Sequence, residues 1–147
     1  MSHSLQKFVD AQENDFDIAL AEIQGGRKRS HWIWYIFPQL KGLGRSTTAS
    51  FYGLENLQEA EAYLQHPVLG PRLLTISRAL LSLSSNDALQ VMGSPDDLKL
   101  RSCMTLFAAV GGTDPVFDQV LQKFFSGQRD PLTLQLLQQE KGSASHA

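Results

Sequence analysis

The sequence predicts an all-α protein, a compact single-domain bundle of about seven to nine helices. Three helix starts can be predicted, because Asp or Ser precedes Pro at Ser94-Pro95, Asp114-Pro115 and Asp130-Pro131. Such residues cap a helix N-terminus, and proline suits the first helical position because its missing N–H would have no partner there. Apolar residues also recur every three or four positions rather than every second one, which is typical of helices and not of strands.

The expected helices run from these starts to the glycines at which the apolar stripes end. We expect helices near residues 4–12, 15–24, 31–37, 56–65, 69–83, 86–92, 95–110, 115–125 and 131–140. The segment 31–37 could also be a short strand, but no partner strand is visible, so helix is preferred. The prediction is one helical domain over residues 1–141, followed by a disordered tail over 142–147.

The predicted core lies along the apolar stripes of the later helices. Four stripe positions should be nearly fully buried: Leu73, Leu80, Phe107 and Phe124. Cys103 lies on the same stripe as Phe107, so its thiol is expected to pack rather than to react. His66 stands between two expected helices and is expected to cap a helix end.

The composition excludes several classes of protein. Of the 147 residues, 42% are hydrophobic and 19% are charged, which indicates a globular rather than a disordered chain. The formal net charge of −2 predicts neither a nucleic-acid partner nor a membrane partner. The single cysteine, and the lack of an apolar leader or of a run of roughly 20 apolar residues, favour a cytoplasmic location. The histidines and the cysteine lack zinc-like spacing, so no metal and no cofactor are expected.

One stretch, residues 30–46, breaks the helical pattern and is where we expect the functional site. Both tryptophans of the chain lie in it, and three basic residues precede them. If its first part is a helix, His31 and Trp34 are three residues apart and share one face. Two interpretations stay open. The aromatic residues and a hydrogen-bonded His31 belong to the core, or His31 and Trp34 line a pocket for a planar or sugar-bearing ligand.

A glycine-rich turn follows the aromatic residues and resembles an anion-binding loop. The backbone N–H groups around Gly42 and Gly44, together with Arg45 and Ser46, would hold a phosphate. The turn matches neither the P-loop nor the dinucleotide-binding fingerprint, so a plain tight turn is the alternative. Lys28, in the preceding basic run, is a further candidate for a phosphate contact.

A second candidate region lies on the expected helix 95–110. Lys99 and Ser102 are three residues apart beside the apolar stripe, where they would face a cleft. The alternative is that both are solvated residues at a helix edge. We expect Lys99 to reach the pocket that His31 and Trp34 border.

These residues resemble a known bacterial family, the domain of unknown function numbered 1810. The blocks that carry the resemblance are residues 28–39, 42–46, 63–70 and 97–107. The match runs from about residue 8 to residue 137 and implies a small, mostly helical protein, with no established reaction. Some members carry the label calpastatin, which nothing in this sequence supports. The chain has Phe16 where the family's tyrosine is expected and Ile33 where methionine is usual.

A more remote resemblance is to the NADAR proteins, which are helical domains that act on ADP-ribose derivatives. Only the fold class and the aromatic-rich segment carry this likeness, so it is an analogy and no residue is transferred from it. It implies that a ligand of this chain would be related to a nucleotide.

The leading functional hypothesis is a protein that binds or hydrolyses a nucleotide-like or ADP-ribose-like small molecule in an aromatic pocket with a basic rim. Trp34 would stack on the ring, and Gln39 would orient the ligand. As an enzyme, the protein would break a glycosidic or phosphate-linked bond. His31 would be the acid/base group, because its unperturbed pKa lies near neutrality, with Glu22 as its partner. The phosphate charge would be balanced by Lys28, Arg45 and Lys99.

The competing hypothesis is a non-enzymatic interaction module that forms a homodimer through its aromatic surface. An enzyme should have a concave pocket on which His31 and Lys99 converge. An interaction module should instead expose a flat apolar patch.

Overall fold

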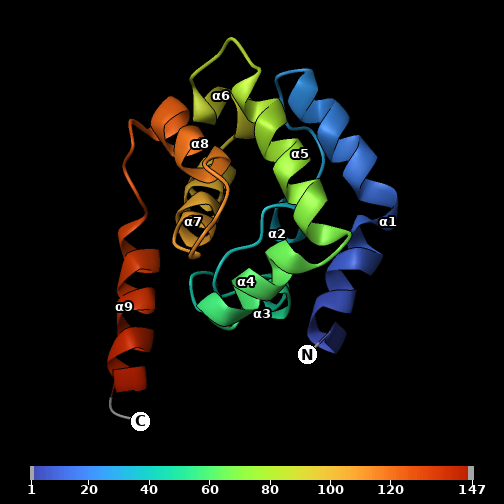
Figure 1. Cartoon of the computed structure of the whole chain (residues 1–147). Helices are drawn as coiled ribbons and strands as arrows, with labels where there is room; N and C mark the ends of the chain where they lie inside the picture. The colour runs from blue at the N-terminus through green and yellow to red at the C-terminus, as the bar shows by residue number, and fades with distance from the viewer. Residues whose placement is uncertain (1, 146–147) are drawn as a thin grey trace.

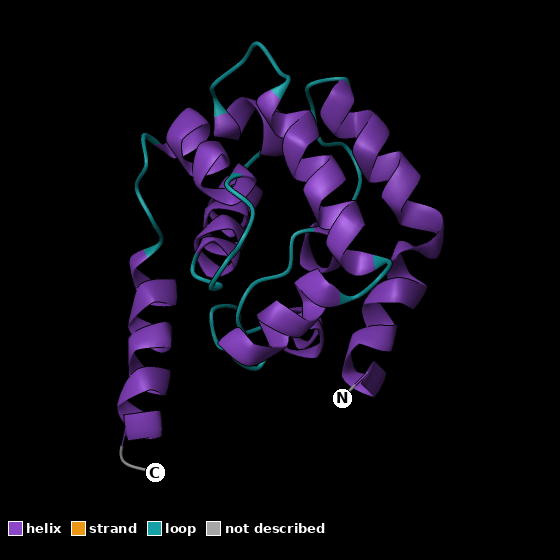
Figure 2. Cartoon of the chain, viewed as in Figure 1, coloured by secondary structure: helices purple, strands orange, loops and turns teal. Residues whose placement is uncertain are grey.

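The computed structural model describes residues 2–145 and confirms an all-α fold. Helix takes up 66% of the chain, and no strand is present among these residues. The helices are α1 (Ser2–Gln24), α2 (Ile33–Ile36), α3 (Thr47–Tyr52), α4 (Leu57–Gln65), α5 (Leu69–Leu81), α6 (Ala88–Met92), α7 (Asp96–Ala108), α8 (Val116–Phe125) and α9 (Pro131–Ser145). An isolated parallel bridge joins Leu40 to Leu54, and Figure 2 shows helices joined by loops.

The helices pack around one hydrophobic core. α1 and α5 lie side by side, and α7 packs against α8 on the far side of α5 from α1 (Figure 1). α9 contacts α7 at the outer edge of the molecule. The single turn of α2 contacts both α1 and α7. This contact places the aromatic stretch between the first helix and the helix that carries Lys99.

Two of the three predicted Asp/Ser-Pro caps are present, and the third is wrong. Asp114 Oδ1 accepts from Val116 N at 2.9 Å, but Ser94 caps nothing, because α7 begins at Asp96 with Pro95 before it and no side chain bonded to its first turn. Asp130 Oδ2 accepts a hydrogen bond from the backbone N–H of Thr133 at 2.9 Å, in the first turn of α9. Asn56 Oδ1 accepts one from Glu59 N at 2.8 Å, at the start of α4. The His66 Nδ1 atom accepts from the N–H groups of Val68, just before α5, and Leu69, its first residue, at 3.1 and 3.3 Å, so His66 is a cap. These bonds satisfy N–H groups that a helix leaves without internal partners.

The predicted helices differ most from the structure in the first third of the chain. The two helices expected over 4–12 and 15–24 are one helix, because its buried positions continue at helical spacing through Gln12, whose side chain donates to Tyr35 O at 2.7 Å. The expected helix 31–37 is reduced to α2, because Trp32 lies outside helical geometry with ψ at 5°. The sequence analysis missed α3, which Ser46 caps by accepting from Ala49 N at 3.0 Å.

The four predicted core residues are buried. Phe107 and Leu80 are 0% exposed, Leu73 is 1% exposed and Phe124 is 8% exposed. The Phe107 ring packs against the rings of Tyr63 and Phe117, with ring centres 5.5 and 5.6 Å away. Cys103 is also fully buried, and burial raises the pKa of its thiol well above the ordinary value. These helices therefore enclose the core that the apolar stripes predicted.

The C-terminal segment continues as helix beyond the expected domain end at 141. Residues 142–145 belong to α9, and residues 146 and 147 lie outside the described residues. The division into a domain over residues 1–141 and a disordered tail over 142–147 stays a prediction. No helix within residues 2–145 is long and apolar enough to span a membrane.

Candidate functional site

Glu22, in the last turn of α1, binds the loop that follows the helix. Its Oε1 accepts hydrogen bonds from the backbone N–H groups of Arg29 at 2.7 Å and Ser30 at 2.9 Å. The indole Nε1 of Trp32 also donates to Oε1, at 2.9 Å, and Ser30 Oγ donates to Oε2 at 2.6 Å. One carboxylate thus fixes the backbone just ahead of the aromatic residues.

These hydrogen bonds keep the Glu22 carboxylate ionised. Partial burial favours the neutral acid, but the bonds from Ser30, Arg29 and Trp32 outweigh that effect and lower the pKa of Glu22 from 4.5 to about 2. A general acid or base works best when its pKa lies near the working pH. The arrangement therefore suits Glu22 to positioning the loop better than to proton transfer.

Lys28 points inward from this loop, between two exposed arginines. Only 7% of its side chain is exposed, and its ammonium pairs with Asp96 Oδ2 at 2.8 Å. The ammonium also donates to Ser30 O at 2.5 Å and lies 5.0 Å from the centre of the Trp32 ring. A buried charge requires such partners. Lys28 therefore ties the loop to the first turn of α7.

Lys99 lies three residues beyond Asp96 on α7 and shares that carboxylate with Lys28. The Lys99 ammonium is 3.4 Å from Asp96 Oδ1 and 5.8 Å from the centre of the Trp34 ring. Trp34 is half-buried, so part of its side chain meets solvent. We call Lys28, Trp34, Asp96 and Lys99 the cation–indole platform. The structure thus brings three residues predicted from the sequence into one cluster.

His31 does not share a helix face with Trp34. It precedes α2 by two residues, so the three-residue spacing no longer aligns the two side chains. Its side chain is exposed. The Tyr35 hydroxyl donates its single proton to Asp15 Oδ2 on α1 and lies 3.3 Å from the backbone carbonyl oxygen of His31. Burial and the neighbouring Asp15 both raise the pKa of Tyr35 above its ordinary value.

The glycine-rich turn has structural roles at two of its predicted ligand positions. A Cβ at Gly44 would lie 2.6 Å from Ala49 Cβ, so Gly44 lets the turn pack closely against α3. The Ser46 hydroxyl caps α3. Gly42 has a φ of 100°, which suits a tight turn, and Arg45 is exposed. These contacts account for the turn without a phosphate.

The last two predicted ligand residues are buried. Gln39 is 9% exposed, and its backbone carbonyl accepts from Leu54 N at 2.9 Å beside the isolated bridge. Ser102 is 7% exposed, and its hydroxyl donates to Leu98 O within α7 at 3.1 Å. No interaction of the described residues joins either side chain to the cation–indole platform.

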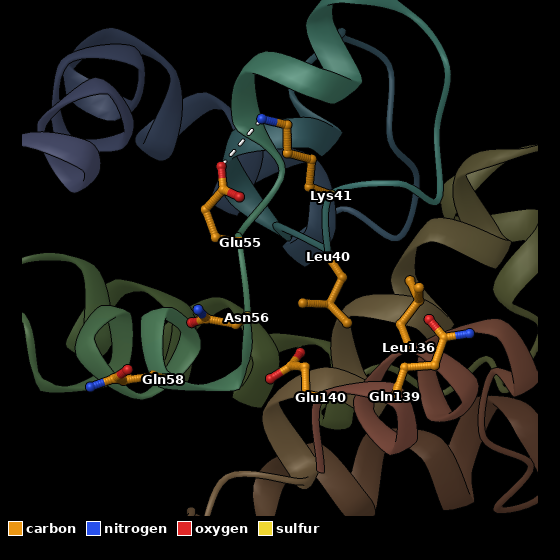
Figure 3. A pocket seen from close by; sticks show the side chains of 8 residues that line it. All are labelled: Leu40, Lys41, Glu55, Asn56, Gln58, Leu136, Gln139 and Glu140. Atoms are coloured by element: carbon orange, nitrogen blue, oxygen red, sulfur yellow. Dashed lines mark hydrogen bonds and ion pairs between the residues drawn. The ribbon is translucent and has the colours of Figure 1, made fainter. Parts of the chain in front are cut away.

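Three hollows on the surface of the described residues lie elsewhere. One, of about 530 Å³, is bounded by α4, α9 and the Lys41–Glu55 ion pair (Figure 3). There Glu140 of α9 accepts a hydrogen bond from Leu57 N at 3.1 Å. The other two have volumes of about 580 and 190 Å³. None of the three is lined by His31, Trp34 or Lys99.

Comparison with known proteins decides the family. A family model described as "Protein of unknown function (DUF1810)" matches residues 2–137. The chain belongs to the DUF1810 family. The solved structure of the conserved hypothetical protein Rv1873 from Mycobacterium tuberculosis is similar, with 42% sequence identity and a TM-score of 0.90. The similarity covers 93% of this chain and 98% of that one. The comparison with curated proteins gave no match.

The two departures from the expected DUF1810 pattern both lie in packed positions. Ile33 is 1% exposed in the core. Phe16 is partly buried, and the Arg72 guanidinium lies 5.4 Å from the centre of its ring. A tyrosine hydroxyl is absent at position 16, but the stacking of a cation on an aromatic ring does not require one.

Sequence reasoning missed Asp96, which joins the two lysines of the platform in this DUF1810 protein. An acidic residue in the first turn of a helix is favoured by the helix dipole alone, so Asp96 carried no separate functional signal. Its distances to Lys28 and Lys99 depend on how the loop folds back onto α7. Within residues 2–145, no group of three His, Cys, Asp or Glu residues is arranged to hold a metal ion.

Proposed function

We propose that this DUF1810 protein binds a small anionic ligand with a planar ring, nucleotide-like or ADP-ribose-like, at the cation–indole platform. The observation that carries the proposal is the Lys99 ammonium, 5.8 Å from the centre of the half-buried Trp34 ring. An indole face stacks on planar rings, and an ammonium beside it attracts the negative charge of a phosphate. One side chain would bind the ring and its neighbour the anion.

The two lysines of the platform have different roles in this proposal. Lys28 is held by Asp96 at 2.8 Å and is 7% exposed, so it belongs to the structure. Lys99 is 23% exposed and only 3.4 Å from the same carboxylate. Because Asp96 is shared, it neutralises Lys99 incompletely. Lys99 is therefore the cation that a ligand phosphate would engage.

The geometry supports binding more directly than hydrolysis. His31 is exposed and lies three residues before Trp34 in the sequence. Among the described residues, no contact joins its imidazole to Trp34 or Lys99. The Glu22 carboxylate is already engaged by four hydrogen bonds. Hydrolysis would add to binding the cleavage of a glycosidic or phosphate-linked bond by His31. That reaction requires the bound ligand to reach the His31 imidazole.

Isothermal titration calorimetry with four related ligands tests the proposal. ADP-ribose and AMP carry both a ring and a phosphate, adenosine lacks the phosphate, and ribose 5-phosphate lacks the base. We expect ADP-ribose and AMP to bind about tenfold or more tightly than the other two, because both contacts contribute.

Two lysine variants separate the platform from general surface charge. Lys99→Ala should weaken AMP binding about tenfold or more, because a charge-assisted contact is lost. Lys41→Ala removes an equally charged lysine, 49% exposed, that lines another hollow, and should leave affinity unchanged. Equal affinities for AMP and adenosine, or equal losses in the two variants, would contradict the proposal.

A further inference from the structure

A groove separate from the platform lies between α6, α7 and α8. Its volume is about 580 Å³, and two phenylalanines of α8, Phe124 and Phe125, form part of its wall. Leu89 of α6 and Leu98 of α7 also line it, and they are 55% and 50% exposed. Two leucines this exposed therefore give the groove an apolar rim.

The groove also holds a carboxylate that lacks a donor. Asp97, in the first turn of α7, lines the groove, and its Oδ1 atom is buried without a hydrogen bond from any described residue. The side chain as a whole is only partly buried, and no described residue forms an ion pair with it, so its negative charge stays uncompensated at the groove. The neighbouring Asp96 instead faces the lysines of the platform. Consecutive aspartates thus serve two different surfaces.

The other charged groups at the groove leave it acidic. Asp87 also lines it, and its Oδ1 accepts from two backbone N–H groups at the start of α6. Lys123 is the nearby cation; its ammonium donates to Asn86 Oδ1 at 2.8 Å and lies 5.4 Å from the Phe124 ring centre, so it offsets one of the two negative charges and leaves one in excess. The groove therefore combines an apolar floor with carboxylates that are not neutralised by an ion pair among the described residues.

We propose that this groove binds a short segment of another protein in which apolar side chains alternate with lysine or arginine. Apolar residues of the segment would cover Leu89 and Leu98, and a cationic side chain would pair with the Asp97 carboxylate. Charge complementarity selects a basic segment over an acidic one. This inference does not depend on the function proposed for the platform, because the two surfaces use different residues.

Fluorescence anisotropy with a labelled peptide in which leucine and lysine alternate tests the inference. An identical peptide with glutamate in place of lysine controls for charge, and a scrambled peptide of the same composition controls for amphipathic pattern. We expect the leucine–lysine peptide to bind, the glutamate peptide not to bind, and the affinity to fall as salt is raised.

Matched leucine variants locate the binding surface. Leu89→Ser combined with Leu98→Ser should lower the affinity at least about tenfold. Leu132→Ser combined with Leu134→Ser removes leucines on α9 that are 57% and 43% exposed, and should leave the affinity unchanged. Asp97→Asn should weaken binding of the basic peptide without unfolding the protein, as circular dichroism would show.

Several results would overturn the inference. Equal affinities in the two double-leucine variants would show that exposed leucine in general attracts the peptide. Equal binding of the glutamate peptide would show that the groove does not select a positively charged segment. If the groove variant does not fold, amide chemical shifts of the wild-type protein decide, since peptide addition must move the signals of Leu89 and Leu98 and not those of Leu132.

Discussion

Replacing Glu22 with alanine should destabilise the protein and loosen the loop that holds the platform. The substitution removes all four hydrogen bonds that the carboxylate accepts. The Arg29 N–H is at the surface and can bond to water instead. Trp32 is 1% exposed, so its indole N–H would be left without a partner, at a cost of about 1–3 kcal/mol. Together with the lost charge-assisted bonds to Ser30, we expect about 2–4 kcal/mol.

Urea unfolding followed by circular dichroism measures this cost. Glu22→Gln should cost only about 1 kcal/mol, because the amide oxygen still accepts from the three N–H groups and the amide nitrogen can donate to Ser30 Oγ. Glu13→Ala, which removes an exposed glutamate from the same helix, should change stability by less than about 0.5 kcal/mol. If Glu22→Ala costs no more than Glu13→Ala, the carboxylate does not hold the loop.

Three further predictions concern the core, the dependence of stability on pH and the exposed histidine. Phe107→Ala should cost about 3–5 kcal/mol in urea unfolding, and a cost under about 1 kcal/mol would place that ring outside the core. The pKa of Glu22 is lowered to about 2 in the folded protein, so the stability that its charge provides should be complete above pH 4.5 and should disappear as the pH falls toward 2. The difference in unfolding free energy between wild type and Glu22→Gln should therefore shrink over that range. His31→Ala should change the free energy of unfolding little, since the side chain is exposed. A loss of stability above about 1 kcal/mol would show that His31 has a structural role.

The helix starts were predictable because their causes are local. Asn56, His66 and Asp130 each bond to N–H groups two or three residues further along the chain, and that pattern is visible in the sequence. The break that the sequence analysis placed in the middle of α1 is absent for a different reason. Asn14 and Asp15 have low helix propensity, and packing of the continuous buried face outweighs it.

The candidate site was predictable only in part, because contacts between distant segments build it. The proximity of Trp34, Lys28 and Lys99 was anticipated from their residue types and positions. The helical alignment of His31 was wrong, because Glu22 and its neighbours hold the chain ahead of α2 in a non-helical loop. No sequence pattern marks a carboxylate that caps a loop eight residues away.

The two indole N–H signals of the protein offer the most direct test of the platform. The chain has two tryptophans, so a ¹H–¹⁵N spectrum should show two indole signals, which Trp34→Phe assigns. On titration with ADP-ribose, we expect the Trp34 signal to move and to saturate, because that ring would stack on the ligand. The Trp32 signal should move less, since its N–H is bonded to Glu22 within the core. A Trp34 signal that stays in place at millimolar ADP-ribose and AMP would contradict a ligand site at the cation–indole platform.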